Sequence, residues 1–139
     1  MKLYLLKKEK GKKYESKAIC EKALHFDLKY EDEKPVGCSI SDTKNYWAIA
    51  IGECGIDIEE NNRKVKPTIV KAFHPNEQKY LEALSFGTSE WYREFLYIWT
   101  AKEAYFKRYG VYFKQYCVLD DQMLMKPDFQ HFEEKGLII

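Results

Sequence analysis

The chain has 139 residues, which is the usual size of one domain. Hydrophobic residues make up 45%, aromatic residues 16% and charged residues 32%, so the composition is that of a folded globular protein and not of a disordered tail. The formal net charge is +1, so no overall field favours nucleic acid as a partner, and no apolar run reaches the roughly 18–20 residues of a membrane span.

The cysteines and the first residues indicate a cellular compartment. The four cysteines are scattered along the chain without C-x-x-C spacing. Charged residues interrupt the start MKLYLLKKEK too early for the apolar core of a secretory signal. We therefore expect a soluble cytoplasmic protein with reduced thiols, without a membrane or nucleic-acid partner.

The first predicted elements are a strand and a helix. Alternation and apolar content predict a short strand over residues 2–6, and the lysine-rich stretch that follows contains Gly11, which suits a turn. The lysines are typical of a solvated turn, with an anion-binding edge as the alternative. Apolar residues at helical spacing predict a short amphipathic helix within residues 14–28, before a polar connection.

The central part of the chain is predicted to form three strands. Residues 36–40 and the YWAIAI run are two of them, and GIDIEE is the third. Gly52 and Gly55 punctuate the connection between the last two strands, which favours a hairpin.

Two helices with clear start signals follow. Pro75 at a first helical position, Glu77 two residues later and His74 near the cap predict a helix within FHPNEQKYLEAL. This pattern assigns His74 to capping or to the surface and not to catalysis.

The second helix is long. Ser89 is predicted to cap a helix over residues 90–109, which Gly110 ends, and residues 111–119 are predicted to form a strand. Helices and antiparallel strands mix without regular β-α-β alternation, which favours a single α+β domain.

The third predicted strand carries two acids. Alternation along a strand points Ile56 and Ile58 to one face and directs Asp57 and Glu59 to the other. Two residues along a strand span roughly 6.5–7 Å, at which two carboxylates can converge on one hard cation. On its own the pattern is a weak signal for a metal site, because half-buried strands show it by default with their acids in solvent.

A third acid interrupts the apolar stripe of the long helix. The stripe consists of Tyr92, Leu96, Trp99, Glu103 and Phe106. A carboxylate that faces a core must be paired, protonated or bound to a metal. Lys107, four residues on, offers an ordinary helical ion pair. Together with Lys102 and Lys107, the three acids outline a site for Mg²⁺ and phosphate.

GIDIEE and WTAKEAYFKRYG resemble the two signature motifs of the 4′-phosphopantetheinyl transferases, which are G-(I/V)-D-(I/V)-E and, about forty residues later, W-x-x-K-E-x-x-x-K. AFHPNEQKYLEAL resembles that family's F-x-P-x-E helix start. The segment KPVGCSISDTKNYWAIAIGE resembles the one that leads into the first motif. The resemblance is closest to the type that acts on peptide and polyketide synthetases, and it covers about residues 34–120.

The resemblance implies an activity and a fold. Such enzymes bind coenzyme A with Mg²⁺ and transfer its 4′-phosphopantetheine arm to a serine of an acyl or peptidyl carrier protein. By carry-over, Asp57, Glu59 and Glu103 would bind the metal, and Glu103 would also be the candidate base. Lys107 would hold the pyrophosphate, and Lys102 would assist it or pair structurally. The expected fold is an antiparallel sheet packed on a long helix.

The chain departs from that pattern in two places. Residues 1–33 form an abbreviated first half beside the motif-bearing half at 34–120, and small single-half relatives assemble as trimers, so a homo-oligomer is compatible with this length. Ile40 stands where the family usually has a histidine that holds coenzyme A. The candidate substitutes for that histidine are Lys12, Lys13 and Lys44, each with a solvated surface role as its alternative.

A basic stretch follows the first motif. The cations Arg63, Lys64 and Lys66 are candidates for docking an acidic carrier protein, with a solvated loop as the alternative. Two other functions stay open from the sequence. One is a relative that binds coenzyme A or a carrier protein without transfer, and the other is an unrelated Mg²⁺-dependent phosphohydrolase.

Overall fold

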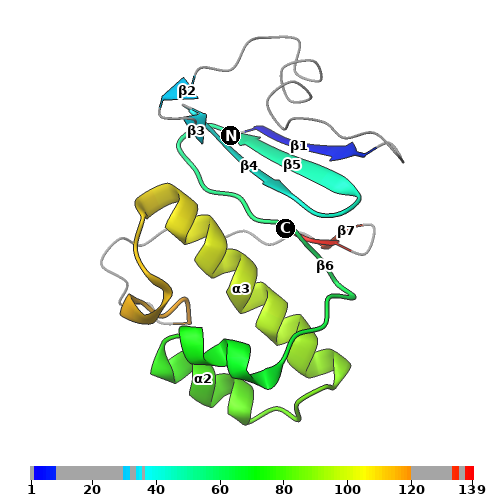
Figure 1. Ribbon diagram of the computed structural model, residues 1–139, viewed down its shortest axis with the longest axis vertical. Coiled ribbons are helices and arrows are strands. Elements are labelled where there is room, and N and C mark those ends of the chain that lie inside the picture. The colour runs from blue at the N-terminus through cyan, green and yellow to red at the C-terminus, as the bar shows by residue number, and fades with distance from the viewer. Residues whose placement is uncertain (1, 9–29, 32–33, 36, 120–132, 135–136) are drawn as a thin grey trace.

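The computed structural model describes residues 2–8, 30–31, 34–35, 37–119, 133–134 and 137–139. A three-stranded sheet lies at one end of the molecule, the long helix α3 crosses its middle, and the short helix α2 lies at the other end (Figure 1). The helix expected within residues 14–28, and the candidates Lys12 and Lys13, lie outside the described residues.

The three-stranded sheet has the antiparallel order β1-β5-β4, with β1 at Lys2–Lys7, β4 at Cys38–Asp42 and β5 at Tyr46–Ile51. The strands predicted in these three regions are confirmed. The central strand β5 is buried at every position from Trp47 to Ala50. Burial on both faces explains why this strand reads as an apolar run and not as an alternating pattern.

The predicted hairpin between β5 and GIDIEE is wrong. Residues 53–58 are not in a strand, and β6, at Glu59–Glu60, pairs with β8, at Leu137–Ile138, and not with β5. We call residues 53–58 the connecting segment. It passes between the sheet and α3 (Figure 1).

Serine hydroxyls of β4 explain this path. The backbone N–H of Ile56 donates to Oγ of Ser39 at 3.0 Å, and that of Ile58 donates to Oγ of Ser41 at 3.3 Å. These two amides are therefore satisfied by side chains and need no strand partner. The side chains of Ile56 and Ile58 pack with Ala48 in one apolar cluster, so the segment also extends the core of the sheet.

Both helices begin and end close to their predicted limits. Helix α2 spans Pro75–Glu82 with His74 as its N-cap, as predicted, and the structure adds a reciprocal capping box between His74 and Glu77. Helix α3 spans Ser89–Tyr109 and ends at Gly110, which has φ 71°. Its N-cap is Thr88 and not Ser89, since the Thr88 hydroxyl accepts from the Trp91 N–H at 3.2 Å.

The strand predicted over residues 111–119 is also wrong. A short 3₁₀ helix, η2, occupies Phe113–Gln115, and the neighbouring residues form no strand. Side chains again satisfy the backbone hydrogen-bonding groups. The N–H of Val118 donates to Glu77 at 2.8 Å, and the carbonyl of Tyr116 accepts from Lys102 at 2.8 Å.

The remaining described elements are short. A second 3₁₀ helix, η1, lies between β6 and α2, and the other strands form two small antiparallel sheets. Their bounds are Pro67–Ala72 for η1, Tyr30–Glu31 for β2, Lys34–Pro35 for β3 and Glu133–Glu134 for β7. The architecture is α+β, as predicted, with small antiparallel sheets and helices.

The helices have an aromatic core of their own. Phe73 and Phe95 are fully buried and stack with ring centroids 5.6 Å apart, and Trp91 stacks on Phe95 at 5.2 Å. The predicted stripe of α3 holds in part, because Phe106 is 41% exposed and lies outside this core. Within the described residues, no helix combines the length and apolar character that crossing a membrane requires.

Candidate functional site

Asp57 lies on the connecting segment with only 7% of its surface exposed. Its Oδ1 accepts hydrogen bonds from the Ser41 hydroxyl at 2.9 Å and from the Lys107 ammonium at 3.1 Å. Its Oδ2 is buried and has no hydrogen-bond partner among the residues that the structure describes. A buried carboxylate oxygen without a partner is costly, so this atom indicates a ligand site.

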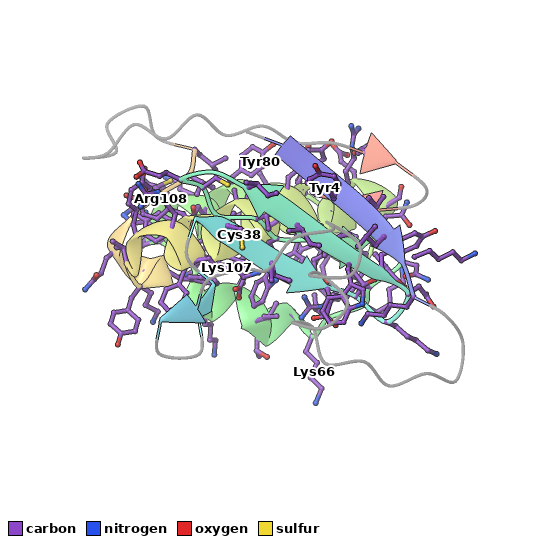
Figure 2. The ribbon with its side chains drawn as sticks, turned by 90° about the horizontal axis from the view of Figure 1, so that it is seen from above. Tyr4, Cys38, Lys66, Tyr80, Lys107 and Arg108 are labelled. Atoms are coloured by element: carbon purple, nitrogen blue, oxygen red, sulfur yellow. The ribbon has the colours of Figure 1, made fainter. Side chains whose placement is uncertain are left out.

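Lys107 joins α3 to the connecting segment. Besides Asp57, its ammonium donates to the carbonyl of Ile56 at 2.8 Å. The Lys107 side chain is 28% exposed, whereas that of Asp57 is 8% exposed. Figure 2 labels Lys107 and the next residue of α3, Arg108, whose guanidinium lies 3.7 Å from Glu53.

Glu59 is held from two sides. Its Oε1 accepts from the indole N–H of Trp99 at 3.0 Å and from the Arg63 guanidinium at 2.5 Å. The guanidinium lies over the Trp99 ring, 5.0 Å from its centroid. Glu59 therefore connects the first motif to the first residue of the second motif.

Glu103 lies one helical turn before Lys107 and is partly buried. It makes no hydrogen bond or ion pair with another described side chain, and it is close enough to Asp57 for their charges to interact. Burial raises the pKa of Glu103, and Asp57 raises it further, against the opposing effects of Lys107 and Arg63. The two motifs thus meet at Asp57, Glu103 and Lys107.

The other two acids share this electrostatic environment. Burial raises the pKa of Asp57 and outweighs the opposing contact with Lys107. Burial is also the main cause that raises the pKa of Glu59. The positive charge of Arg63 opposes this shift, and the negative charge of Asp57 adds to it. All three acids therefore hold their protons more tightly than in water, a pattern that clusters at functional sites.

These raised values predict an effect on stability. Because burial raises the pKa of Glu103, the folded protein holds this proton more tightly than the unfolded chain does. The protonated side chain therefore favours folding below about pH 4, and this stabilisation is lost as the pH rises through the folded-state pKa. We expect Glu103→Gln, in chelator-treated protein, to melt at a higher temperature than wild type at pH 7. The gain should disappear below about pH 4, where both side chains are neutral.

Thermal unfolding followed by circular dichroism at several pH values checks this expectation. Glu82→Gln is the control, because Glu82 is an exposed acid of α2. A lower melting temperature for Glu103→Gln at pH 7, or the same gain in Glu82→Gln, would contradict it.

The donor set fits a hard divalent cation in its chemistry, although it is not arranged around one. Oxygen ligands of this kind suit Mg²⁺, and Oδ2 of Asp57 is unpaired among the described residues. Among the residues that the structure describes, no three His, Cys, Asp or Glu side chains are grouped closely enough to hold a metal ion. Lys107 and Arg63 instead pair with Asp57 and Glu59.

Lys102 lies apart from this group. Its side chain is fully buried, and its ammonium pairs with the equally buried Glu77 at 2.6 Å and donates to the Tyr116 carbonyl at 2.8 Å. The hydroxyl of Tyr116 donates back to the carbonyl of Lys102 at 2.7 Å. These contacts favour the structural pairing that was one of two predicted roles for Lys102.

The remaining basic candidates are dispersed. Lys44 is exposed in the turn between β4 and β5, and Lys66 projects from the body of the molecule (Figure 2). Lys64 lies over the Tyr92 ring, 4.3 Å from its centroid. Ile40 packs against Ile49 of the central strand, so an apolar contact fills the position where a histidine was expected.

Two contacts of the site were not predicted from the sequence. Ser41 donates to Asp57, and the Trp99 indole donates to Glu59. Ser39 and Ser41 have the same two-residue spacing as Ile56 and Ile58, whose amides donate to them, and this matching spacing is the sequence feature that accompanies the serine contacts. The sequence carries no comparable signal for the buried pair of Glu77 with Lys102.

Comparison with known proteins gives the family. The model of the 4′-phosphopantetheinyl transferase superfamily matches residues 53–134, which is more than half of the chain. No curated protein matches the sequence. The matched range contains the connecting segment and α3, which bring Asp57, Glu103 and Lys107 together. The chain therefore belongs to the 4′-phosphopantetheinyl transferase superfamily.

Proposed function

We propose that this protein transfers the 4′-phosphopantetheine arm of coenzyme A to a serine of an acyl or peptidyl carrier protein, with Mg²⁺. Membership of the superfamily supports phosphopantetheine transfer in general. The observation that carries the finer proposal is the meeting of Asp57, Glu103 and Lys107, which come from two motifs about forty residues apart. We further propose the family's arrangement of sheet against long helix, with the connecting segment between them.

The acids are assigned to the metal. Asp57 and Glu103 would hold the cation, with Glu59 as a third ligand, and the free Oδ2 of Asp57 supports this assignment. When bound, Mg²⁺ neutralises the charge that develops on the pyrophosphate oxygens. The ion pairs of Lys107 with Asp57 and of Arg63 with Glu59 must rearrange for all three acids to contribute.

Two residues of this chain are assigned to proton transfer and to phosphate binding. A partly buried carboxylate with a raised pKa is a better base than one in water, so Glu103 would take the proton of the serine hydroxyl. The serine oxygen would then bond to the phosphorus that carries the pantetheine arm while the P–O bond of the pyrophosphate linkage breaks, and adenosine 3′,5′-bisphosphate would leave. Lys107, whose ammonium is partly exposed, would bind the pyrophosphate oxygens.

Isosteric changes of the two acids test the proposal. We expect Asp57→Asn and Glu103→Gln each to reduce transfer by about 100-fold or more, which is the usual contribution of a positioned acid or base. The assay mixes the protein with Mg²⁺, coenzyme A and several carrier proteins that lack the arm, and measures the carrier's intact mass. Glu53→Gln is the matched control, since Glu53 lies on the same segment with a side chain that is 91% exposed.

An adduct on the carrier that persists in Asp57→Asn would contradict the assigned site. A wild-type protein that binds coenzyme A in calorimetry but forms no adduct on any carrier would instead favour a relative that binds without transfer. Ile40 is the observation that favours this second function, because its apolar side chain cannot donate a hydrogen bond to phosphate.

A further inference from the structure

The Lys107 ammonium occupies the place beside Asp57 where a divalent cation would bind. It lies 3.1 Å from Asp57 Oδ1 and 2.8 Å from the Ile56 carbonyl, so two oxygens of the connecting segment coordinate one internal cation. The second carboxylate oxygen of Asp57 is buried and has no partner within the described part of the chain. Lys107 therefore pairs with one of the two oxygens of the Asp57 carboxylate.

We propose that Lys107 is a built-in counter-ion of Asp57 that competes with the divalent cation, and that binding of the cation releases the Lys107 ammonium toward an anionic ligand. This inference rests on the proposed function. It goes beyond that function because it assigns Lys107 two alternating partners, the Asp57 carboxylate and the ligand's phosphate oxygens.

Charge repulsion makes the two cations competitors. A divalent cation on Asp57 would lie close to the ammonium, and like charges a few ångströms apart repel strongly in a partly buried site. The ammonium would lose its favourable pairing with Asp57 once that carboxylate binds a metal. Each cation therefore weakens the binding of the other, and by linkage the effect is reciprocal.

Lys107 is also the cation of the site that is free to move. Lysine carries a compact charge on a flexible four-carbon stem, and its partial exposure lets the ammonium swing outward without repacking a core. Lys102, by contrast, is fully buried and held by Glu77. Arg63 lies over the Trp99 ring, which restricts its guanidinium.

Competition gives a prediction that a simple phosphate-binding role does not. A lysine that binds phosphate without contacting Asp57 would have only a small, salt-screened effect on the affinity for a metal when coenzyme A is absent. A lysine that occupies Asp57 lowers that affinity. We therefore expect Lys107→Met to bind Mn²⁺ at least about fivefold more tightly than wild type, the lower end of typical coupling between two sites.

The experiment measures Mn²⁺ binding by electron paramagnetic resonance, with chelator-treated full-length protein and without coenzyme A. Lys114→Met is the matched control, because it removes the same charge from an exposed lysine of η2. Its dissociation constant should stay within about twofold of the wild-type value, as expected for an exposed surface charge that salt screens.

The outcomes separate the two proposals. Equal or weaker binding of Mn²⁺ by Lys107→Met, with wild type binding normally, would overturn the competition and leave the proposed function standing. Absence of Mn²⁺ binding in both proteins would overturn the metal site and the competition together. If Lys114→Met bound Mn²⁺ as much more tightly as Lys107→Met does, the change in net charge would explain the effect. This result would also overturn the inference.

A second measurement needs no variant. Released Lys107 should react faster with acetic anhydride when Mn²⁺ is present, as read by peptide mass spectrometry of the wild-type protein. Lys114 serves as the internal control, and its labelling should not change. Slower or unchanged labelling of Lys107 at saturating Mn²⁺ would contradict the release.

Discussion

Gly55→Ala is expected to abolish transfer and to lower the free energy of unfolding by about 3 kcal/mol or more, the upper range for overpacking. A Cβ at this position would lie 1.8 Å from the carbonyl oxygen of Ala104 and 2.8 Å from its carbon. Both atoms belong to the backbone of α3, so no side chain can rotate to make room. The connecting segment would have to move away from the helix.

Such a shift reaches the site directly. Gly55 is two residues from Asp57, and Ala104 follows Glu103, so the contact between Gly55 and Ala104 sets the distance between the two motifs. Separation of the segment from α3 would also break the ion pair of Asp57 with Lys107. Loss of transfer should therefore exceed what the loss of stability explains at temperatures where the variant is folded.

Urea denaturation and the carrier-mass assay check this prediction, with Gly87→Ala as the control. Gly87 has φ 85° but open space around its Cβ position, so alanine there costs only backbone strain of about 1–2 kcal/mol. Transfer by Gly87→Ala should survive. Equal behaviour of the two variants would show that close packing at Gly55 is unimportant.

Lys102→Met is expected to destabilise the protein by about 3–5 kcal/mol, because it leaves the Glu77 carboxylate buried without its cation. The ammonium also serves the Tyr116 carbonyl and lies over the Tyr116 ring, 4.1 Å from its centroid. One substitution therefore removes a contact between α2 and α3 and a contact to the segment after α3.

Denaturant unfolding of a double-mutant cycle measures the coupling. Glu77→Gln with Lys102→Met should cost less than the sum of the single changes, since no unpaired charge remains. Lys79→Met is the control, and as an exposed lysine of α2 it should shift the free energy of unfolding by no more than about 0.5 kcal/mol. Additive single effects would show that Glu77 and Lys102 do not stabilise each other.

The sequence was sufficient where local chemistry decides the structure. The His74 cap, Pro75 at the first helical position and Gly110 at the end of α3 are local signals, and the structure confirms each of them. The strands β4 and β5 were predictable for the same reason, because turn residues separate them and β5 is an apolar run.

Local patterns failed where side chains satisfy the backbone. Residues 55–60, four of which lie in the connecting segment, and residues 111–119 have strand-like composition, and both stretches were predicted as strands. Their amides and carbonyls instead bond to Ser39, Ser41, Glu77 and Lys102, which lie elsewhere in the chain. Such contacts depend on the tertiary fold, so periodicity within either stretch carries no sign of them.

The candidate site shows the same division. The residue types and their spacing identified Asp57, Glu103 and Lys107, and the structure brings these three together. The partners of these residues were not predictable, since a carboxylate in a motif does not reveal whether a lysine, a serine or a metal will satisfy it. The assignment of the three residues to metal and phosphate remains our proposal.

The two serine hydroxyls of β4 have a consequence for how this protein can evolve. Backbone pairing between strands uses main-chain groups, so its hydrogen bonds do not depend directly on which side chains the strands carry. Here the amides on either side of Asp57 are held by Ser39 and Ser41, which are single, mutable side chains. Selection can therefore adjust the position of this acid one codon at a time, while the pairing of β4 with β5 and the architecture around it stay the same.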